Sequence, residues 1–447
     1  MGELETSGDQ PSARRGRLAS LLVDLSPLQQ SPQFARLWIG TSVAQIGAQV
    51  TIVAVGLHVY ALTRSTLAVA LVALWALGPM ILAGFVGGAL ADRFDRRAVS
   101  LVTATAAWLS IGAMTTIAFF DVTATWPYYA LAAINAASAT ILGATRGAIL
   151  PRLLPTQLLP AAAALSGITM GLSVTVGPAI AGVLVATAGF AWTYLLDAVL
   201  FTAAFIGILG LPAMRPEGRP SAPGFASLVE SLRFLRRAPN VRATFIFDLV
   251  AMTLGTPRVV FPAVGALVLG GGAVTVGLLT AAFAVGALVS GLLSGPLGRV
   301  RRQGRAVTWA IAAYGAFTAL FGLVLLITGV VLPALPGADR NTVWPALLLA
   351  GTALAGAGAA DNVSAVFRTT ILQAAAPDEV RGRMQGLFYV VVAGGPRVGD
   401  LLAGALATVI ALWAPALLGG LVILALMLVF LRVFSGFQRY DALHPTP

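Results

Sequence analysis

The segment that decides the fold is Gly84-Phe-Val-Gly-Gly-Ala-Leu-Ala-Asp-Arg-Phe-Asp-Arg-Arg97. It closes a long apolar run and ends in an acid followed by several Arg. Gly84 and Gly88 are four residues apart, a spacing that allows a second helix to pack closely inside a membrane. Arg clusters directly after an apolar run are typical of cytoplasmic loops. The segment therefore predicts the cytoplasmic end of a transmembrane helix.

The composition of the whole chain agrees with a membrane location. Of the 447 residues, 58% are apolar and only 10% are charged, whereas about a quarter are charged in a soluble domain. Gly and Pro are numerous but follow no period, which excludes collagen, and the long apolar runs exclude a disordered chain. We therefore expect an all-α polytopic membrane protein.

The residue inventory argues against an enzyme. The chain contains no Cys and two His, so no disulfide, thiolate nucleophile or Cys/His metal site is expected. Phosphate-binding loops of the Walker type and the Gly-x-Ser-x-Gly and His-Glu-x-x-His motifs are also missing from the sequence. We expect no cofactor and no resident metal, so an ion gradient is left as the energy source.

Twelve stretches are long and apolar enough to span a bilayer, which takes about 20 residues. No cleavable signal pattern precedes the first of them. The predicted spans are 37–61, 67–91, 98–120, 126–149, 159–187, 191–212, 242–267, 274–298, 305–332, 344–371, 385–409 and 413–433.

The distribution of Arg predicts the orientation. The net charge is +11 and all 28 basic residues are Arg. All but four belong to the N-terminal segment, the C-terminal tail or the loops on one side; the exceptions are Arg64, Arg258, Arg340 and Arg397. By the positive-inside rule, both termini are expected to be cytoplasmic, in the cytoplasmic membrane of a bacterium. The positive charge then needs no nucleic-acid partner.

The chain contains an internal repeat. A shift of 207 residues places Ala19-Ser-Leu21 and Pro32 on Ala226-Ser-Leu228 and Pro239, and a shift of 222 places Arg146 and Pro155 on Arg368 and Pro377. Two tandem six-helix halves are typical of transporters with a binding site at the midplane between the halves. The predicted domains are a cytoplasmic segment 1–36, a six-helix bundle 37–212, a cytoplasmic linker 213–241, a second six-helix bundle 242–433 and a cytoplasmic tail 434–447. The linker pattern predicts an amphipathic helix, which lies on the inner leaflet or is simply solvated.

The Gly84–Arg97 segment resembles the signature loop Gly-x-x-x-Asp-Arg-x-Gly-Arg-Arg of the major facilitator superfamily, with Asp95 in the place of the Gly. The resemblance implies a gating loop in which Asp92 is a latch against the start of span 11 and Arg96 is a second charge partner. The alternative is a topology anchor alone. The expected gating residues are Gly88, Asp92, Arg93, Arg96 and Arg97.

A second motif lies in span 5, where Gly177, Pro178 and Gly182 look like the Gly-Pro motif of exporters in this superfamily. Pro removes a backbone hydrogen bond and Gly lets a neighbouring helix approach, which makes a bendable seam. Together with Pro257–Ala263 and Pro377–Met384, the loop around Asp92 is similar to the enterobactin-exporter branch. That branch implies export of a siderophore or drug driven by a proton gradient.

Charged residues inside the spans are expensive in lipid and therefore mark candidate functional sites. Pro257 and Pro262 are expected to interrupt span 7 on either side of Arg258. The predicted cavity residues are Asp248, Arg258, Asp361, Ser364, Arg368 and Arg397, and the predicted proton sites are Asp361 and Asp400. The alternative for these charges is a salt bridge between helices that only fixes packing. Asp197 and His58 are expected at helix interfaces.

These features predict a secondary transporter that works by alternating access. The leading hypothesis is a proton-coupled exporter of a siderophore or drug-like molecule. The alternatives are an importer or facilitator of a small polar solute, or a membrane sensor without transport. The expected partners are a small-molecule substrate, protons and the lipid bilayer, with no nucleic acid, and the chain is expected to be a monomer.

Overall fold

The computed structural model describes residues 25–215, 233–255, 257–294, 297, 300–331, 343–375, 378–444 and 446. Within them the chain folds into long helices and short connections. The first half contains α2 (Ser26–Gln30), α3 (Pro32–Thr63), α4 (Thr66–Arg93), α5 (Arg96–Phe119), α6 (Trp126–Leu153), a 3-10 turn (Thr156–Leu158), α7 (Leu159–Thr187) and α8 (Gly189–Leu209). The second half contains α10 (Pro239–Leu254), the 3-10 turn η2 (Arg258–Val260), α11 (Phe261–Leu267), α12 (Gly272–Leu292), α13 (Gln303–Leu326) with a π-helical end (Ile327–Val331), α14 (Trp344–Ala375), α15 (Asp378–Val409), α16 (Ala414–Val433) and α17 (Ser435–Gln438).

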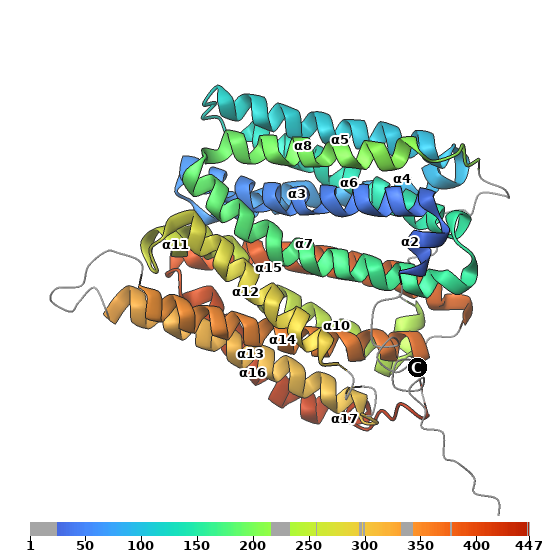
Figure 1. Cartoon of the computed structure of the whole chain (residues 1–447). Coiled ribbons are helices and arrows are strands. Elements are labelled where there is room, and N and C mark those ends of the chain that lie inside the picture. Colours follow the sequence, from blue (N-terminus) through green and yellow to red (C-terminus); the bar gives the residue numbers. More distant parts are fainter. Residues whose placement is uncertain are drawn as a thin grey trace, which may run out of the picture.

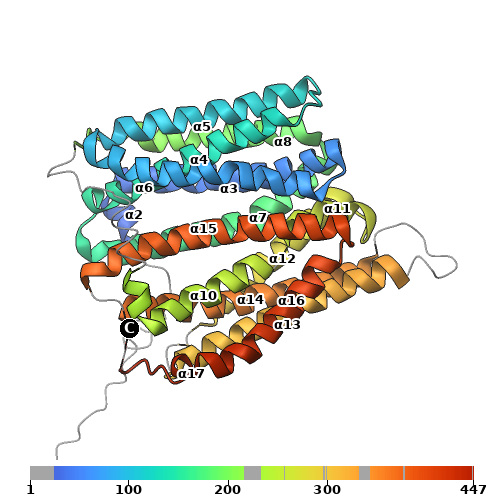
Figure 2. The same cartoon turned by 180° about the vertical axis from the view of Figure 1, so that it is seen from behind.

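The helices form two bundles that lie side by side, one from each half of the chain (Figures 1 and 2). We call them the N-lobe (α3 to α8) and the C-lobe (α10 to α16). Helices α7 and α12 form one junction between the lobes, and α4 and α15 form the other. The two-bundle architecture expected from the sequence is confirmed.

In the described residues, ten segments are long and apolar enough to cross a membrane. The two remaining predicted spans correspond to α6 and α15, which have the required length but a more polar composition. Helix α6 carries Asn135 and Arg146 among small residues, and α15 begins with a charged turn and contains Arg397 and Asp400. Helices of this kind are stable in a membrane when their polar groups face protein or water.

The internal repeat of the sequence is a repeat of helices. Helix α3 begins at Pro32 and α10 begins at Pro239, which are 207 residues apart as in the sequence repeat. Helices α6 and α14 end at Leu153 and Ala375, and this separation equals the second shift of 222. Subtracting 207 from a residue number in α10, or 222 from one in α14, therefore gives the equivalent position in the N-lobe.

The departure from the signature loop at Asp95 has a structural reason. Asp95 is the N-cap of α5, and its carboxylate accepts hydrogen bonds from the backbone N–H groups of Arg97 (2.8 Å) and Ala98 (3.2 Å). An N-cap of this type stabilises a helix by about 1 kcal/mol. Asp95, which stands where the signature loop has Gly, thus fixes the residue at which α5 begins.

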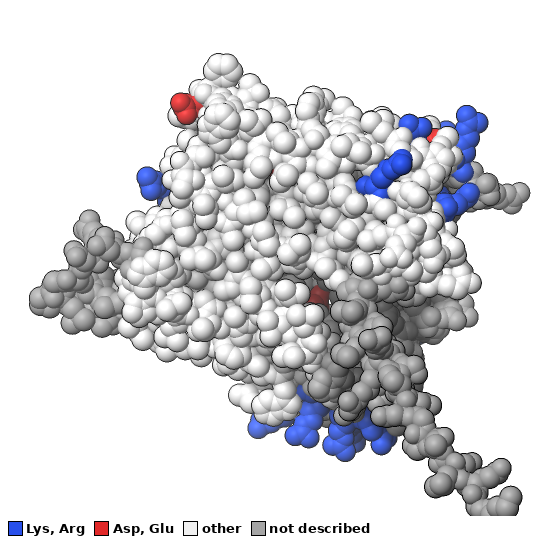
Figure 3. Space-filling view, viewed as in Figure 1, with Lys and Arg blue, Asp and Glu red and all other residues white. Residues whose placement is uncertain are grey.

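Arg and acidic side chains gather at the ends of the bundle, and the wall between them is almost free of charge (Figure 3). We call the end at which α3 begins and α16 ends the Arg-rich end; its cytoplasmic location stays a prediction. One residue assigned to a loop by sequence is corrected. Arg368 is 2% exposed within α14, so it is an interior residue and not a surface anchor.

Most of the predicted amphipathic linker lies outside the described residues. Residues 233–237 at its end are helical.

Candidate functional site

Span 7 is broken near the middle of the membrane, as the prolines predicted. Helix α10 ends at Leu254, and a Cβ at Gly255 would overlap the Tyr314 hydroxyl and the Ala251 carbonyl. The chain then forms the short turn η2 and continues as α11, with Pro262 in its first turn. Pro257 supplies no backbone N–H, and regular helical structure is interrupted between Leu254 and Arg258.

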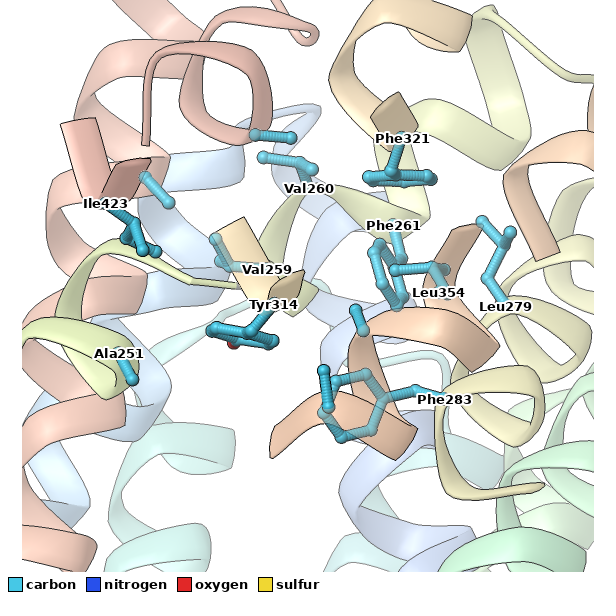
Figure 4. Close-up of a cluster of buried hydrophobic side chains, with 14 of the residues drawn as sticks. Ala251, Val259, Val260, Phe261, Leu279, Phe283, Tyr314, Phe321, Leu354 and Ile423 are labelled. Atoms are coloured by element: carbon cyan, nitrogen blue, oxygen red, sulfur yellow. The ribbon is translucent and has the colours of Figure 1, made fainter. Parts of the chain in front are cut away.

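The break is held by tight apolar packing. Val259, Val260 and Phe261 are buried in a cluster with Tyr314 and Phe321, and Figure 4 shows these side chains converging from different helices. The Phe261 and Phe321 rings lie 5.8 Å apart in an edge-to-face arrangement. This cluster fixes the backbone of η2 and so determines where Arg258 is placed.

Arg258 is exposed although it lies in the middle of a membrane span. Its guanidinium carbon lies 4.8 Å from the centroid of the Phe283 ring of α12, a cation-π contact worth about 1 kcal/mol or more when water is excluded. The contact directs Arg258 toward the junction of the two lobes.

Arg258 lines an open cavity between α7 and α12, in and around which there is about 950 Å³ of empty space, open solvent included. Small and apolar residues of the two helices form most of the wall, including Gly167, Gly171, Ala284 and Leu288. The polar groups of the lining are Arg258 and Asn362 of α14. An apolar wall with few polar groups is typical of a site for an organic ligand.

Asp400 connects η2 to α15. Its carboxylate accepts a hydrogen bond from the backbone N–H of Val259 and interacts electrostatically with Arg258 and Arg397. Arg397 lies one turn away on α15, and its Nη2 atom is 3.2 Å from the Met80 sulfur of α4 in the N-lobe. The group of Arg258, Arg397 and Asp400 therefore reaches from the helix break to the other lobe.

A second group of charges lies inside the C-lobe. Arg368 of α14 makes an ion pair of 2.8 Å with Asp248 of α10 and lies 3.5 Å from Asp361 of its own helix. Ser364, Asp248 and Arg368 are 0 to 2% exposed, whereas the Asp361 side chain is 20% exposed. The polar stripe on span 10 is thus formed, but most of it faces the interior of the lobe.

The structure separates the predicted cavity residues into two sets. Arg258 lines the cavity, and Arg397 joins it through Asp400. Asp248, Ser364 and Arg368 are buried between α10 and α14 in this conformation, and the ion pair of Asp248 with Arg368 has the geometry of the packing alternative. Their role in substrate binding stays a prediction. Asp361 lies at the boundary between the two environments.

The Gly-Pro motif lies where α7 crosses α12. A Cβ at Gly182 would be 2.6 Å from the Ala273 carbonyl oxygen, and a Cβ at Gly277 would be 2.6 Å from the Pro178 carbonyl oxygen. A Cβ at Gly177 would instead meet the Gln49 side chain of α3, within the N-lobe. The motif thus permits backbone contact between the lobes near the end opposite the Arg-rich end.

The other lobe junction has a polar contact at the same end. The Thr66 hydroxyl at the start of α4 lies 3.1 Å from the Gly404 carbonyl oxygen and 3.1 Å from the Thr408 hydroxyl of α15. Both junctions thus have close contacts between the lobes at the end opposite the Arg-rich end. The cavity lies toward the Arg-rich end.

The predicted gating loop is described in part. The surroundings of Gly88 and the side chain of Asp92 are outside what the structure describes, so the latch stays a prediction. Arg93 lies 5.7 Å from the Phe94 ring centroid. Arg96 donates to the Ala148 carbonyl of α6 (2.8 Å), and Arg97 donates to the Leu209 carbonyl of α8 (3.0 Å). These bonds join the start of α5 to its own lobe.

Asp197 and His58 are both inside the N-lobe, as expected. Asp197 of α8 is fully buried against Gly47 of α3. The His58 ring stacks on Phe190 at 4.1 Å and its Nδ1 is 3.3 Å from the Tyr194 hydroxyl. Both residues fix helix contacts.

Residues 23–444 match a protein family described as transmembrane secretion effector. The chain belongs to this family. The family is part of the major facilitator superfamily, which confirms the resemblance of the Gly84–Arg97 loop. Among curated relatives, the enterobactin exporter EntS of Citrobacter koseri is 27% identical over 96% of this chain and 98% of its own length. EntS of Shigella boydii is 28% identical over 95% and 97%.

Solved structures of other transporters share the fold. A POT family transporter in complex with 5-aminolevulinic acid has a TM-score of 0.70 at 14% identity and covers 91% of this chain and 97% of that one. A bacterial homologue of the iron transporter ferroportin in an inward-facing state has a TM-score of 0.63 at 15% identity, over 91% and 98%. This member of the transmembrane secretion effector family is a multi-pass membrane transporter and not an enzyme.

Sequence reasoning missed Phe283, Asn362 and Met80. Phe283 orients Arg258, Asn362 lines the cavity, and Met80 receives Arg397. Asn362 could have been noticed beside Asp361, but an uncharged Phe or Met in an apolar helix has no distinguishing pattern.

Proposed function

We propose that this transporter exports an anionic siderophore or drug-like molecule across the bacterial cytoplasmic membrane, in exchange for protons. The observation that carries the proposal is the position of Arg258: an exposed cation on a broken helix, in the wall of an apolar cavity between the lobes. The names of the relatives support a siderophore as cargo. We further propose that the protein acts as a monomer with both termini in the cytoplasm.

Arg258 is suited to bind an acidic or hydroxyl-rich cargo. Its guanidinium presents several N–H donors in a fixed plane, which matches carboxylate and catecholate oxygens. The apolar wall lowers the local dielectric constant on one side of the guanidinium, which strengthens such a hydrogen bond relative to one in bulk water. The apolar side chains of α7 and α12 would contact the aromatic or aliphatic parts of the cargo.

We propose Asp400 as the proton site, with Asp361 as the second candidate. Asp400 interacts with Arg258, which lines the cavity, and with Arg397, which reaches Met80 in the other lobe. Its protonation would weaken the hold on both Arg residues. A single proton would then affect both the binding group and a contact between the lobes.

The charge balance determines how proton and cargo are coupled. Protonation of Asp400 removes a negative charge beside Arg258, so at this site alone it would strengthen the binding of an anion. Direct competition therefore cannot drive exchange. We propose that exchange works through the contact of Arg397 with Met80, because a protonated Asp400 releases Arg397 and thereby changes the junction of α4 and α15.

The test uses the purified full-length protein in proteoliposomes with an imposed pH gradient and enterobactin as the probe cargo. We expect wild type to accumulate the cargo against its gradient, and Asp400→Asn to lose gradient-driven accumulation at least tenfold while it still exchanges labelled for unlabelled cargo. Arg258→Gln is expected to lose both activities. Asp441→Asn, which changes an exposed carboxylate, is the matched control.

Two outcomes would overturn parts of the proposal. If Asp400→Asn and Asp361→Asn both still drive cargo against its gradient, neither is the proton site. If cargo and protons move in the same direction, the chain is an importer. Direct binding at Arg258 favours this alternative, because protonation of Asp400 would strengthen the binding of an anion there. Proton movement is followed with a pH dye inside the vesicles.

A further inference from the structure

The N-lobe contains a counterpart of the buried Arg368 site. The shift of 222 that relates α6 to α14 places Arg146 at the position of Arg368. In the C-lobe, the acidic partners of Arg368 are Asp248 and Asp361. The equivalent N-lobe positions are Thr41, by the shift of 207, and Ala139, by the shift of 222. The N-lobe therefore keeps the Arg but has neither carboxylate.

Thr41 and Arg146 lie together in the structure, as this equivalence requires. Both line a pocket between α3, α6 and α7, together with Trp38, Ser42 and Thr169. The empty space in and around the pocket is about 330 Å³, open solvent included, and the pocket itself is much narrower than the cavity at Arg258. It can hold one functional group of a ligand but not a large molecule.

The polar groups of this pocket include unused donors. Arg146 is partly buried, and no hydrogen bond or ion pair joins its guanidinium to another residue within the described part of the chain. The Trp38 Nε1 atom is buried and has no acceptor there either. The Thr41 and Ser42 hydroxyls donate to carbonyls of their own helix, at 2.6 and 2.7 Å. Carboxylates are absent from the pocket lining.

Arg146 is counted by sequence with the loop Arg, but it lies inside α6, where a partly buried cation without a counter-charge is costly. Arg146 lies seven residues before the end of α6, which is about 10 Å from the Arg-rich end at 1.5 Å per residue. In the C-lobe the chain itself supplies the counter-charge. In the N-lobe a charge from outside the chain would serve the same purpose.

We propose that the Arg146 pocket is a binding site for an oxyanion, a carboxylate or phosphate group that takes the place of the Asp248 carboxylate of the C-lobe. Arg146 supplies the charge and a two-pronged set of N–H donors, and the Trp38 N–H is a further donor. The oxyanion comes from a soluble solute or from a lipid headgroup. The site lies in the other lobe from Arg258 and does not depend on the direction of transport.

The experiment measures thermal unfolding of the purified full-length protein in phosphatidylcholine nanodiscs. Acetate and inorganic phosphate are the probes, and chloride at equal ionic strength is the reference. A ligand that binds only the folded state raises the melting temperature in proportion to the logarithm of its concentration. A second set of nanodiscs contains phosphatidylglycerol, which distinguishes a lipid headgroup from a soluble anion.

The decisive variant is Thr41→Asp, which rebuilds the C-lobe arrangement. We expect it to raise the melting temperature without any anion and to weaken the response to acetate and phosphate at least tenfold. Thr41→Val, which adds no charge, should respond like wild type. Arg146→Gln should not respond. A response to phosphatidylglycerol that Thr41→Asp removes would assign the site to lipid and support the proposal.

The proposal is overturned if wild type responds to none of these anions more than to chloride. It is also overturned if Thr41→Asp responds as strongly as wild type. Neither result bears on the pH-gradient experiment with Asp400, so the two proposals can fail independently.

Discussion

The guanidinium of Arg368 in α14 and the carboxylate of Asp248 in α10 form an ion pair of 2.8 Å inside the C-lobe, with side chains 3% and 1% exposed. The pair joins two helices through residues that are more than a hundred positions apart in the chain. A buried pair of this kind is sensitive to the loss of one partner, because the remaining charge has no solvent.

We predict that Asp248→Asn lowers the free energy of unfolding by about 3 kcal/mol, the lower end for breaking a buried pair. The loss is limited because Asp361 remains 3.5 Å from Arg368. Thermal unfolding of the detergent-solubilised protein measures it. Asp441→Asn, which breaks the exposed pair with Arg301, is the control and should have little effect. An unchanged melting temperature in Asp248→Asn would contradict the prediction.

The close crossing of α7 and α12 gives a second prediction. In Gly277→Val the new side chain would meet the Pro178 carbonyl oxygen and the Gly182 backbone, so the helices must separate. We expect normal membrane insertion but at least a tenfold loss of transport in proteoliposomes. Gly112→Ala is the matched control, since a Cβ there has no atom within 4 Å. Full activity of Gly277→Val would show that the lobes do not need this contact.

The tail gives a prediction about pH. Asp441 accepts a hydrogen bond of 2.8 Å from Arg301, and this partner holds the pKa of Asp441 below its usual value of 3.8. Because the pKa of Asp441 is lowered, the pair stabilises the folded tail at every pH above 3.8. This stabilisation is lost as the pH falls through the pKa that Asp441 has in the folded protein. Hydrogen exchange at residues 439–444 should therefore, after correction for the intrinsic rate, be constant between pH 8 and pH 5. A change within that range would show that another group holds the tail.

Much of the fold could be predicted from the sequence because a membrane imposes a simple length rule on apolar helices. The break at Arg258 was predictable too, since Pro257 and Pro262 act locally. The offset of 207 agrees with the starts of α3 at Pro32 and α10 at Pro239, and the offset of 222 agrees with the ends of α6 at Leu153 and α14 at Ala375.

The partners of the buried charges could not be predicted. Helical spacing indicated Asp361 as the neighbour of Arg368, but the shorter contact is with Asp248 on another helix. Whether a charged side chain faces the cavity or the lobe interior depends on the rotation of each helix, which a nearly uniform apolar pattern does not reveal. The same limit applies to the contact of Arg397 with Met80.

We expect the clustering of Arg at one end of the bundle to affect the kinetics of cargo capture as well. The cavity reaches residues close to that end, Gly167 of α7 and Leu292 at the end of α12. A positive rim around a low-dielectric opening concentrates anions and accelerates their encounter with the site, and this steering weakens as salt shortens the Debye length. The residues that orient the chain in the bilayer would thus also select, by rate, which solutes reach Arg258.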